Sequence, residues 1–147
     1  MIHSQANKFA AMIVPASIND ATATEIELDT LGFDYCTIYV YFGAMAAAMT
    51  ALSVKEGDTS GSYDSTAIAA YGTTDDIAGS TSALPTASDD GKCFMFDIDL
   101  KGRKRYLELT ATGAAGANLI GAFALLSRAD NGPVTAADRG AGNVVRI

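Results

Sequence analysis

Apolar and polar residues alternate along most of this chain in short segments, which are separated by clusters of Gly, Ser, Asn and Asp. A period of two puts alternate side chains on a core, which is the pattern of a half-buried β-strand. The chain of 147 residues suits one domain. We therefore expect an all-β fold, a single-domain β-sandwich over residues 1–147. Strands are expected at 9–14, 24–28, 35–42, 49–56, 94–100, 104–112, 119–128 and 143–147, with a short one at 67–71.

The clearest strand pair lies in the segment FMFDIDLKGRKRYLEL. A two-residue turn at 101–102 would place Leu100 opposite Arg103 and Asp99 opposite Lys104. The segment is therefore expected to form a hairpin with one apolar face. That face would comprise Phe94, Phe96, Ile98, Leu107 and Leu109.

One segment, NLIGAFALLSRAD, admits two interpretations. Its Ala and Leu residues favour a helix. Gly121 in the middle, with apolar residues on both faces, suits a central strand buried on two sides. We expect a strand at 119–128, with a helix as the alternative.

Two stretches lack this periodicity. Residues 57–92 are dominated by Gly, Ser, Thr and Asp, and a loop of this length is typically a binding surface or poorly ordered. Residues 129–147 read as an extended C-terminal arm, because Pro and Gly interrupt 129–142 before strand-forming residues resume. These residues, Val144, Val145 and Ile147, are expected to add a strand to a sheet edge of the same subunit or of a neighbour.

Catalytic, metal and cofactor signatures are weak. The only histidine is His3, and neither GKC nor GAAGANLIG has the spacing of a nucleotide-binding loop. Acidic pairs at 75–76 and 89–90, together with Asp58 and Asp64, could hold calcium, although no EF-hand pattern is present. We expect a protein that is not an enzyme, with no cofactor, and the calcium question stays open.

Charge and hydropathy constrain the partners. A formal net charge of −7 argues against nucleic acid, which requires clustered Lys and Arg. No apolar run approaches the ~20 residues of a membrane-spanning helix. Cys36 and Cys93 are expected to be buried free thiols, because neither lies in a metal or redox spacing. No membrane or nucleic-acid partner is therefore expected.

The segment YCTIYVYF places three tyrosines, Tyr35, Tyr39 and Tyr41, on the face opposite Cys36, Ile38, Val40 and Phe42. Tyrosine combines a large apolar ring with a hydroxyl and is enriched at protein interfaces. We expect a second subunit to cover these tyrosines. In the alternative, the second sheet of the sandwich covers them.

A cationic patch stands out in this acidic chain. Lys101, Arg103 and Lys104 lie at the expected turn. They could simply keep a hairpin tip soluble, or they could dock on an acidic protein surface, where complementary charge fixes the register of binding. Both interpretations stay open.

The segment FDIDLKGRKRYLELTATGAAGANLIGAFALLSRADNGPVTAADRG, with ALSVKEGDTSGSYDS upstream, resembles capsid decoration (cement) proteins of tailed bacteriophages. The likeness covers residues 52–140. It implies a jelly-roll-like sandwich that assembles as a homotrimer on the capsid exterior, after synthesis in the host cytoplasm, and clamps neighbouring copies of the major capsid protein.

On this reading Lys101, Arg103 and Lys104 would contact the capsid and Tyr35, Tyr39 and Tyr41 would form the subunit interface. The alternatives are a carbohydrate- or receptor-binding β-sandwich of a virion, or a head-completion or tail structural protein.

Overall fold

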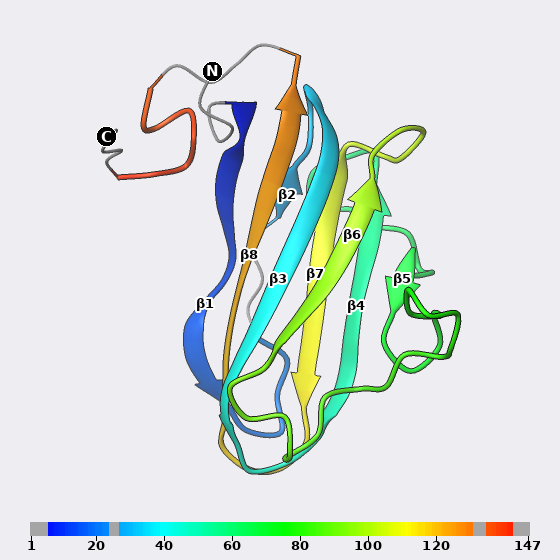
Figure 1. Cartoon of the computed structure of the whole chain (residues 1–147), viewed down its shortest axis with the longest axis vertical. Helices are drawn as coiled ribbons and strands as arrows, with labels where there is room; N and C mark the ends of the chain where they lie inside the picture. The colour runs from blue at the N-terminus through cyan, green and yellow to red at the C-terminus, as the bar shows by residue number, and fades with distance from the viewer. Residues whose placement is uncertain (1–5, 24–26, 131–134, 143–147) are drawn as a thin grey trace.

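Two antiparallel sheets pack face to face in the computed structural model, which describes residues 6–23, 27–130 and 135–142 (Figure 1). The first sheet has the order β1-β8-β3-β6, with β1 at Lys8–Ile18, β8 at Asn118–Ala129, β3 at Phe33–Met45 and β6 at Cys93–Asp99. The second has the order β2-β7-β4-β5, with β2 at Leu28–Asp29, β7 at Tyr106–Gly113, β4 at Met49–Gly57 and β5 at Ala69–Ala70.

This strand order is that of a jelly roll, in which the chain crosses repeatedly between two sheets. Strands β1, β3, β6 and β8 lie in the first sheet and the others in the second, so most connections pass from one layer to the other (Figure 1). The expected all-β sandwich is therefore confirmed.

The core lies between the sheets and is built from the alternate residues of each strand. On β3, Cys36, Ile38, Val40 and Phe42 are fully buried. They face side chains of β4 and β7 that are also buried, namely Leu52, Val54, Leu107, Leu109 and Ala111. The second sheet therefore covers the Cys36–Phe42 face of β3, and the alternative in which it covers the tyrosines is wrong.

The expected hairpin between 94–100 and 104–112 is also wrong, although its turn is present. The Arg103 N–H donates to the Leu100 carbonyl over 3.0 Å, and Gly102 has a φ of 76°. Strand β6 pairs with β3, whereas β7 pairs with β4 and β2. The residues expected on one apolar face do share the core, but they reach it from opposite sheets. Alternation fixes which face of a strand is buried and leaves its hydrogen-bonding partner open.

The ambiguous segment at 119–128 is a strand, as expected. β8 is the second strand of its sheet and pairs with both β1 and β3. The structure explains the glycine at position 121, because a Cβ there would lie 3.2 Å from the ring of Pro15 on β1. The Ala and Leu residues that favour a helix in isolation are held in the sheet by pairing on both sides.

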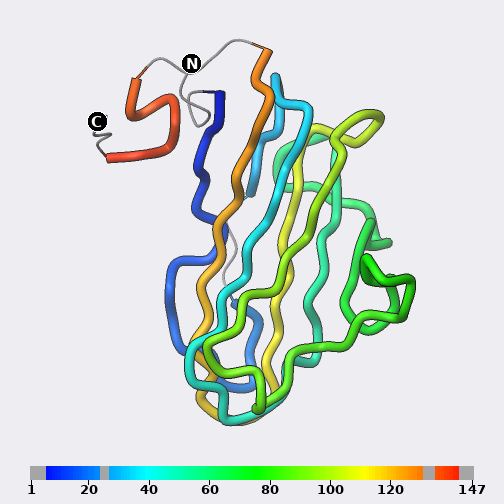
Figure 2. Tube along the Cα trace, viewed as in Figure 1, coloured from blue at the N-terminus to red at the C-terminus, as the bar shows by residue number. Residues whose placement is uncertain are grey.

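The long connection between β4 and β6 closes one side of the sandwich (Figure 2). It contains β5, which lies within the expected strand at 67–71, and next to it Tyr71. The Tyr71 hydroxyl donates to the Met95 carbonyl over 2.8 Å and accepts from the Met95 N–H over 3.2 Å. The Tyr71 ring packs edge-on against Phe94 and Phe96. Much of this connection is therefore fastened to the sheets.

The C-terminal region differs from the extended arm that we expected. Residues 135–142 form turns, and the Arg139 carbonyl accepts a hydrogen bond from the Phe9 N–H at 2.8 Å. Asp138 and Thr135 each accept a hydrogen bond from the other's backbone N–H, which favours a turn over an extended chain. The expected strand residues Val144, Val145 and Ile147 lie outside the described residues, as do residues 24–26 of the expected strand at 24–28.

We expect Leu109→Ala to lower the free energy of unfolding by about 2–5 kcal/mol, because it leaves a cavity between the two sheets. Leu31→Ala is the matched control, since Leu31 is 66% exposed in a loop, and its effect should stay within about 0.5 kcal/mol. Urea unfolding measures both. Equal losses for the two variants would contradict the placement of the core.

Candidate functional site

The outer faces of the two sheets differ in chemistry. On the second sheet, β4 and β7 present polar side chains to solvent, and Lys55 lies directly opposite Glu108 and Ser53 opposite Thr110. Opposite charges and hydroxyl pairs of this kind stabilise a solvated sheet face. This face is an ordinary exterior surface.

The first sheet instead presents mainly apolar and aromatic side chains to the outside, with Thr37, Asp97 and Asp99 as polar exceptions near the β6 edge. Tyr39 is paired with Phe123 of β8 on one side and with Met95 of β6 on the other, so the three share the outer face. Of the eight exposed large hydrophobic side chains in the described part of the chain, five lie on this face: Phe9, Tyr35, Tyr41, Met95 and Leu119. We call the outer face of β1-β8-β3-β6 the aromatic face, comprising Phe9, Tyr35, Tyr39, Tyr41, Met95, Leu119, Phe123 and Leu125.

Three rings of the aromatic face stack across three neighbouring strands. Phe123 lies with its ring centroid 4.9 Å from Phe9 of β1 and 4.9 Å from Tyr39 of β3. Interplanar angles of 29° and 21° make both contacts stacked. The rings therefore hold one another in place. Because these side chains are already ordered, little of their entropy is lost when a partner binds this apolar surface.

A hollow of about 940 Å³ lies beside these rings, over β1 and β8. Its lining includes Val14 and Pro15, where the pairing of β1 with β8 shifts register twice, and Leu119 and Tyr41 at the other side. Gly121 also lines the hollow and fills none of it with a side chain. Ser17 and Tyr41 supply the only polar side chains of its lining among the described residues.

The structure places all three expected interface tyrosines on this face, with Tyr35 and Tyr41 exposed and Tyr39 half-buried under its stacking partner. Sequence reasoning missed Phe9, Met95, Leu119 and Phe123. The signal was present, because β8 is apolar on both faces. The same pattern is typical of a strand buried on two sides, whereas the structure leaves one of the two apolar faces of β8 outermost.

The two cysteines differ. Cys36 is buried in the core, and burial raises the pKa of its thiol to about 12. Cys93 is free but exposed, which corrects the expectation that it is buried. It is paired with Tyr41 and therefore lies on the outer face of β6.

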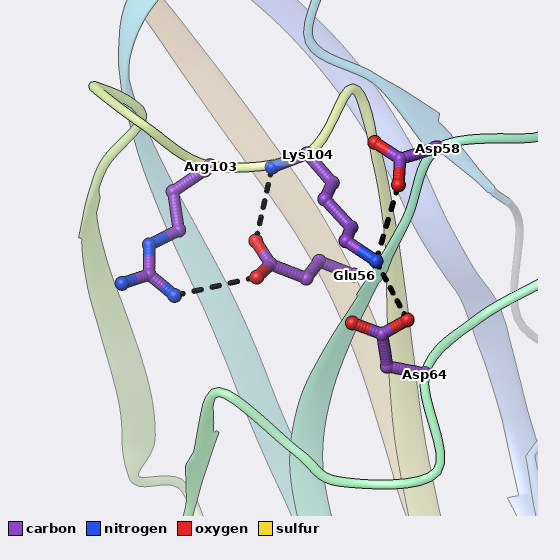
Figure 3. Close-up of polar contacts among 5 residues, drawn as sticks. All are labelled: Glu56, Asp58, Asp64, Arg103 and Lys104. Atoms are coloured by element: carbon purple, nitrogen blue, oxygen red, sulfur yellow. Dashed lines mark hydrogen bonds and ion pairs between the residues drawn. The ribbon is translucent and has the colours of Figure 1, made fainter.

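The cationic patch is largely neutralised within the molecule (Figure 3). The Lys104 ammonium lies between two carboxylates, 3.1 Å from Asp58 and 2.8 Å from Asp64, and these partners raise its pKa. The carboxylate of Glu56 accepts from the Lys104 N–H at 3.1 Å and from Arg103 at 3.5 Å. Lys104 therefore holds the loop after β4 against the loop before β7.

Lys101 is the member of the patch that stays available. It is exposed, and within the described ranges its ammonium forms no ion pair, unlike the side chains of Arg103 and Lys104. The neighbouring Arg105 is bound to Asp29, with nitrogen-to-oxygen distances of 2.9 and 2.7 Å. The sequence pattern revealed the cations, but the sequence-distant carboxylates that pair with them were not foreseen.

The acidic residues considered for calcium bind groups of the chain itself. Asp89 accepts from Lys92 and from the backbone N–H and hydroxyl of Thr86, which lower its pKa to about 2. Asp76 accepts from two backbone N–H groups of its own loop, and Asp90 accepts from the Met45 N–H. Within residues 6–23, 27–130 and 135–142, no group of three or more His, Cys, Asp or Glu side chains is arranged to hold a metal ion.

In the same ranges, no helix is long and apolar enough to cross a membrane. Neither protein-family models nor curated proteins match this chain.

Another carboxylate, that of Glu27, binds the loop that also contacts Lys104. Glu27, just before β2, accepts from the Ser60 hydroxyl, the Gly61 N–H and the Tyr63 hydroxyl. These hydrogen bonds favour the charged form, so the pKa of Glu27 lies below its ordinary value. Glu27 and Lys104 thus fasten the same loop, 58–64, from two sides.

We expect Glu27→Gln to lower the melting temperature at pH 7, because the charged carboxylate is the form that the loop binds. A depressed pKa adds stability above the pKa of the unfolded chain, near 4.5, and this stability is lost as the pH falls through the lower value of the folded protein. Thermal melts from pH 7 to 3 should show the difference from wild type shrinking below pH 4.5. A difference that grows on acidification would contradict the assignment.

Proposed function

We propose that this protein is a non-enzymatic structural component of a virion, which decorates and stabilises a bacteriophage capsid by clamping neighbouring capsid subunits on the exterior. The resemblance of residues 52–140 to capsid decoration proteins supports this role, and jelly rolls occur in viral capsid and lectin domains. Since a fold hosts many functions, the argument depends on the surface rather than on the fold.

The observation that carries the proposal is the contrast between the two outer faces. A solvated sheet needs polar side chains outside, as the second sheet has. The aromatic face instead leaves Tyr41 52% and Leu119 47% exposed in the isolated chain. A contiguous apolar patch on a folded domain marks an interaction site. We infer that the aromatic face is covered by a neighbouring subunit in a homo-oligomer, a trimer by the resemblance.

The chemistry of the hollow favours a protein over a carbohydrate as the occupant. A sugar requires several directed hydrogen bonds in addition to ring stacking, whereas Ser17 and Tyr41 are the polar side chains in the described lining. The rings of Phe9 on β1 and Tyr39 on β3 are also already stacked against Phe123 of β8. Apolar side chains of another subunit match this lining better.

For the capsid contact we propose Lys101 as the main determinant, with Arg103 and Lys104 acting chiefly within the fold. The two latter side chains already have carboxylate partners. Lys101 has no ion-pair partner among the described residues, so it gives up no interaction within its own chain when it binds a carboxylate of the major capsid protein.

We expect the wild-type chain to form an oligomer at tens of micromolar in sedimentation velocity, and Leu119→Arg to shift it to monomer, because a charge would be desolvated in the interface. Thr110→Arg adds the same charge to the polar face of the second sheet and should leave the oligomer intact. A monomeric wild type would overturn the proposal. Glycan binding by that monomer on an array would favour the carbohydrate alternative.

We also expect Lys101→Glu to weaken binding to capsids that lack the protein and to reduce the salt dependence of that binding, since screening acts on exposed charge pairs. Lys55→Glu, on the polar face, is the matched control and should bind as wild type does. Cosedimentation at several salt concentrations measures both. Unchanged binding of Lys101→Glu would remove the patch from the mechanism.

A further inference from the structure

Strand β6 has a regular hydrogen-bonding edge with no strand beyond it. β6 is last in its sheet, and its pairing with β3 runs from Tyr35 opposite Asp99 to Tyr41 opposite Cys93 without a register shift. The backbone groups of an antiparallel strand point alternately to one side and the other. The Leu100 N–H bonds Asp34 of β3's end, whereas both backbone groups of Met95 point outward to Tyr71. The N–H and C=O of Asp97 and Asp99 therefore point outward as well.

The other sheet edges are protected. β1 carries two register shifts and Pro15, which has no N–H, and the Phe9 N–H at its start is bound by Arg139. Bulges and prolines are devices that prevent the addition of a strand. β2 and β5 have two residues each. Among the described strands, β6 is thus the one with a regular edge. Tyr71 occupies the outward backbone groups of Met95, so the part of the edge that can accept a strand is at Asp97 and Asp99.

The surroundings of this edge differ on its two sides. Toward the core lies a hollow of about 390 Å³ that is lined mainly by apolar side chains, among them Ile77, Phe96 and Ile98, and also by Asp75 and Asp76. The Ile77 side chain is fully exposed there in the isolated chain. On the outer side of the same edge, Asp97 and Asp99 present carboxylates. A strand added here would meet apolar groups with one set of alternate residues and negative charge with the other.

We propose that residues 143–147 of a second copy of this chain add to β6 as an extra strand. This inference rests on the proposed assembly and identifies a second contact within it. In the sequence NVVRI, Val145 and Ile147 would share one face of an added strand and Val144 and Arg146 the other. Val145 and Ile147 would then enter the hollow beside Ile77. Arg146 would lie along Asp97, whose carboxylate also accepts from the Thr37 hydroxyl, and Asp99, whose carboxylate also accepts from the Lys101 N–H.

Chain length requires that the donor is a neighbour. Residues 135–142 lie on the outer side of β1, at the opposite edge of the sheet from β6 (Figures 1 and 2). From there to a position beyond β6 is about five strand spacings, or roughly 24 Å. Five extended residues span at most about 18 Å. Residues 143–147 therefore cannot pair with β6 of their own subunit.

This arrangement has a consequence for symmetry. In the sequence, the donated segment comes directly after residues 135–142, which lie beside β1, whereas the accepting edge is β6. Each subunit therefore uses two different surfaces. Contacts of this head-to-tail type close into rings, with a trimer among the possible results, or form open filaments. The strand donation is thus compatible with the trimer of the proposed function.

The test is a charge exchange in the full-length chain. Arg146→Glu and Asp97→Lys should each reduce the association constant at least tenfold in sedimentation velocity, and the double variant should recover most of it. Arg146→Lys keeps the charge and should associate like wild type. Circular dichroism establishes that both single variants are folded.

Hydrogen exchange gives a second readout. In the wild-type oligomer the amides of Asp97 and Asp99 should be protected, and in Arg146→Glu they should exchange freely. Single variants that assemble normally, or rapid exchange of these amides in the wild-type oligomer, would overturn the inference. If Leu119→Arg still dissociates that oligomer, the proposed function stands without the strand donation, so the two failures are distinguishable.

Discussion

The packing of the buried side of β3 against β4 and β7 is the interaction on which the rest of the structure depends. Ile38, Val40 and Phe42 are fully buried against Leu52, Leu109 and their neighbours. Since β-strand side chains alternate, burying this set fixes the tyrosines on the opposite face. The same rule then places Met95 of β6 and Phe123 of β8 beside Tyr39. The aromatic face is therefore a geometric consequence of the core, and its composition is the feature that requires an explanation in function.

Hydrogen bonds from loops complete the sandwich at its sides and ends. Tyr71 occupies both backbone groups of Met95, while Glu27 and Lys104 fasten the loop after β4. These polar contacts lie at the periphery, where solvent weakens each of them. Their role is to position the connections, and the stability of the fold resides in the apolar contacts between the sheets.

Period-two patterning sufficed to predict most of the described strands, the sandwich and the side of β3 that carries the tyrosines. It could not predict which strands pair. Phe96 of β6 and Leu107 of β7 would be buried both if the two strands paired and if they faced each other across the core. The ion pairs of Lys104 were equally hidden, since Asp58 and Asp64 are 46 and 40 residues away in the sequence. For Cys93, alternation with Phe94, Phe96 and Ile98 indicates the outer face once the strand is extended by one residue, because β6 begins at Cys93.

We propose that a neighbouring subunit covers the aromatic face, and this cover can be tested directly. Met95 provides a direct probe, because its side chain is 43% exposed in the isolated chain whereas Met12, Met45 and Met49 are buried. The measurement is paramagnetic broadening of methyl signals from methionine labelled with carbon-13, using a soluble gadolinium complex at high and low protein concentration. If a neighbouring subunit covers the aromatic face, the Met95 methyl is shielded at high concentration and broadened on dilution. Equal broadening at all concentrations, in a protein that remains folded, would contradict it.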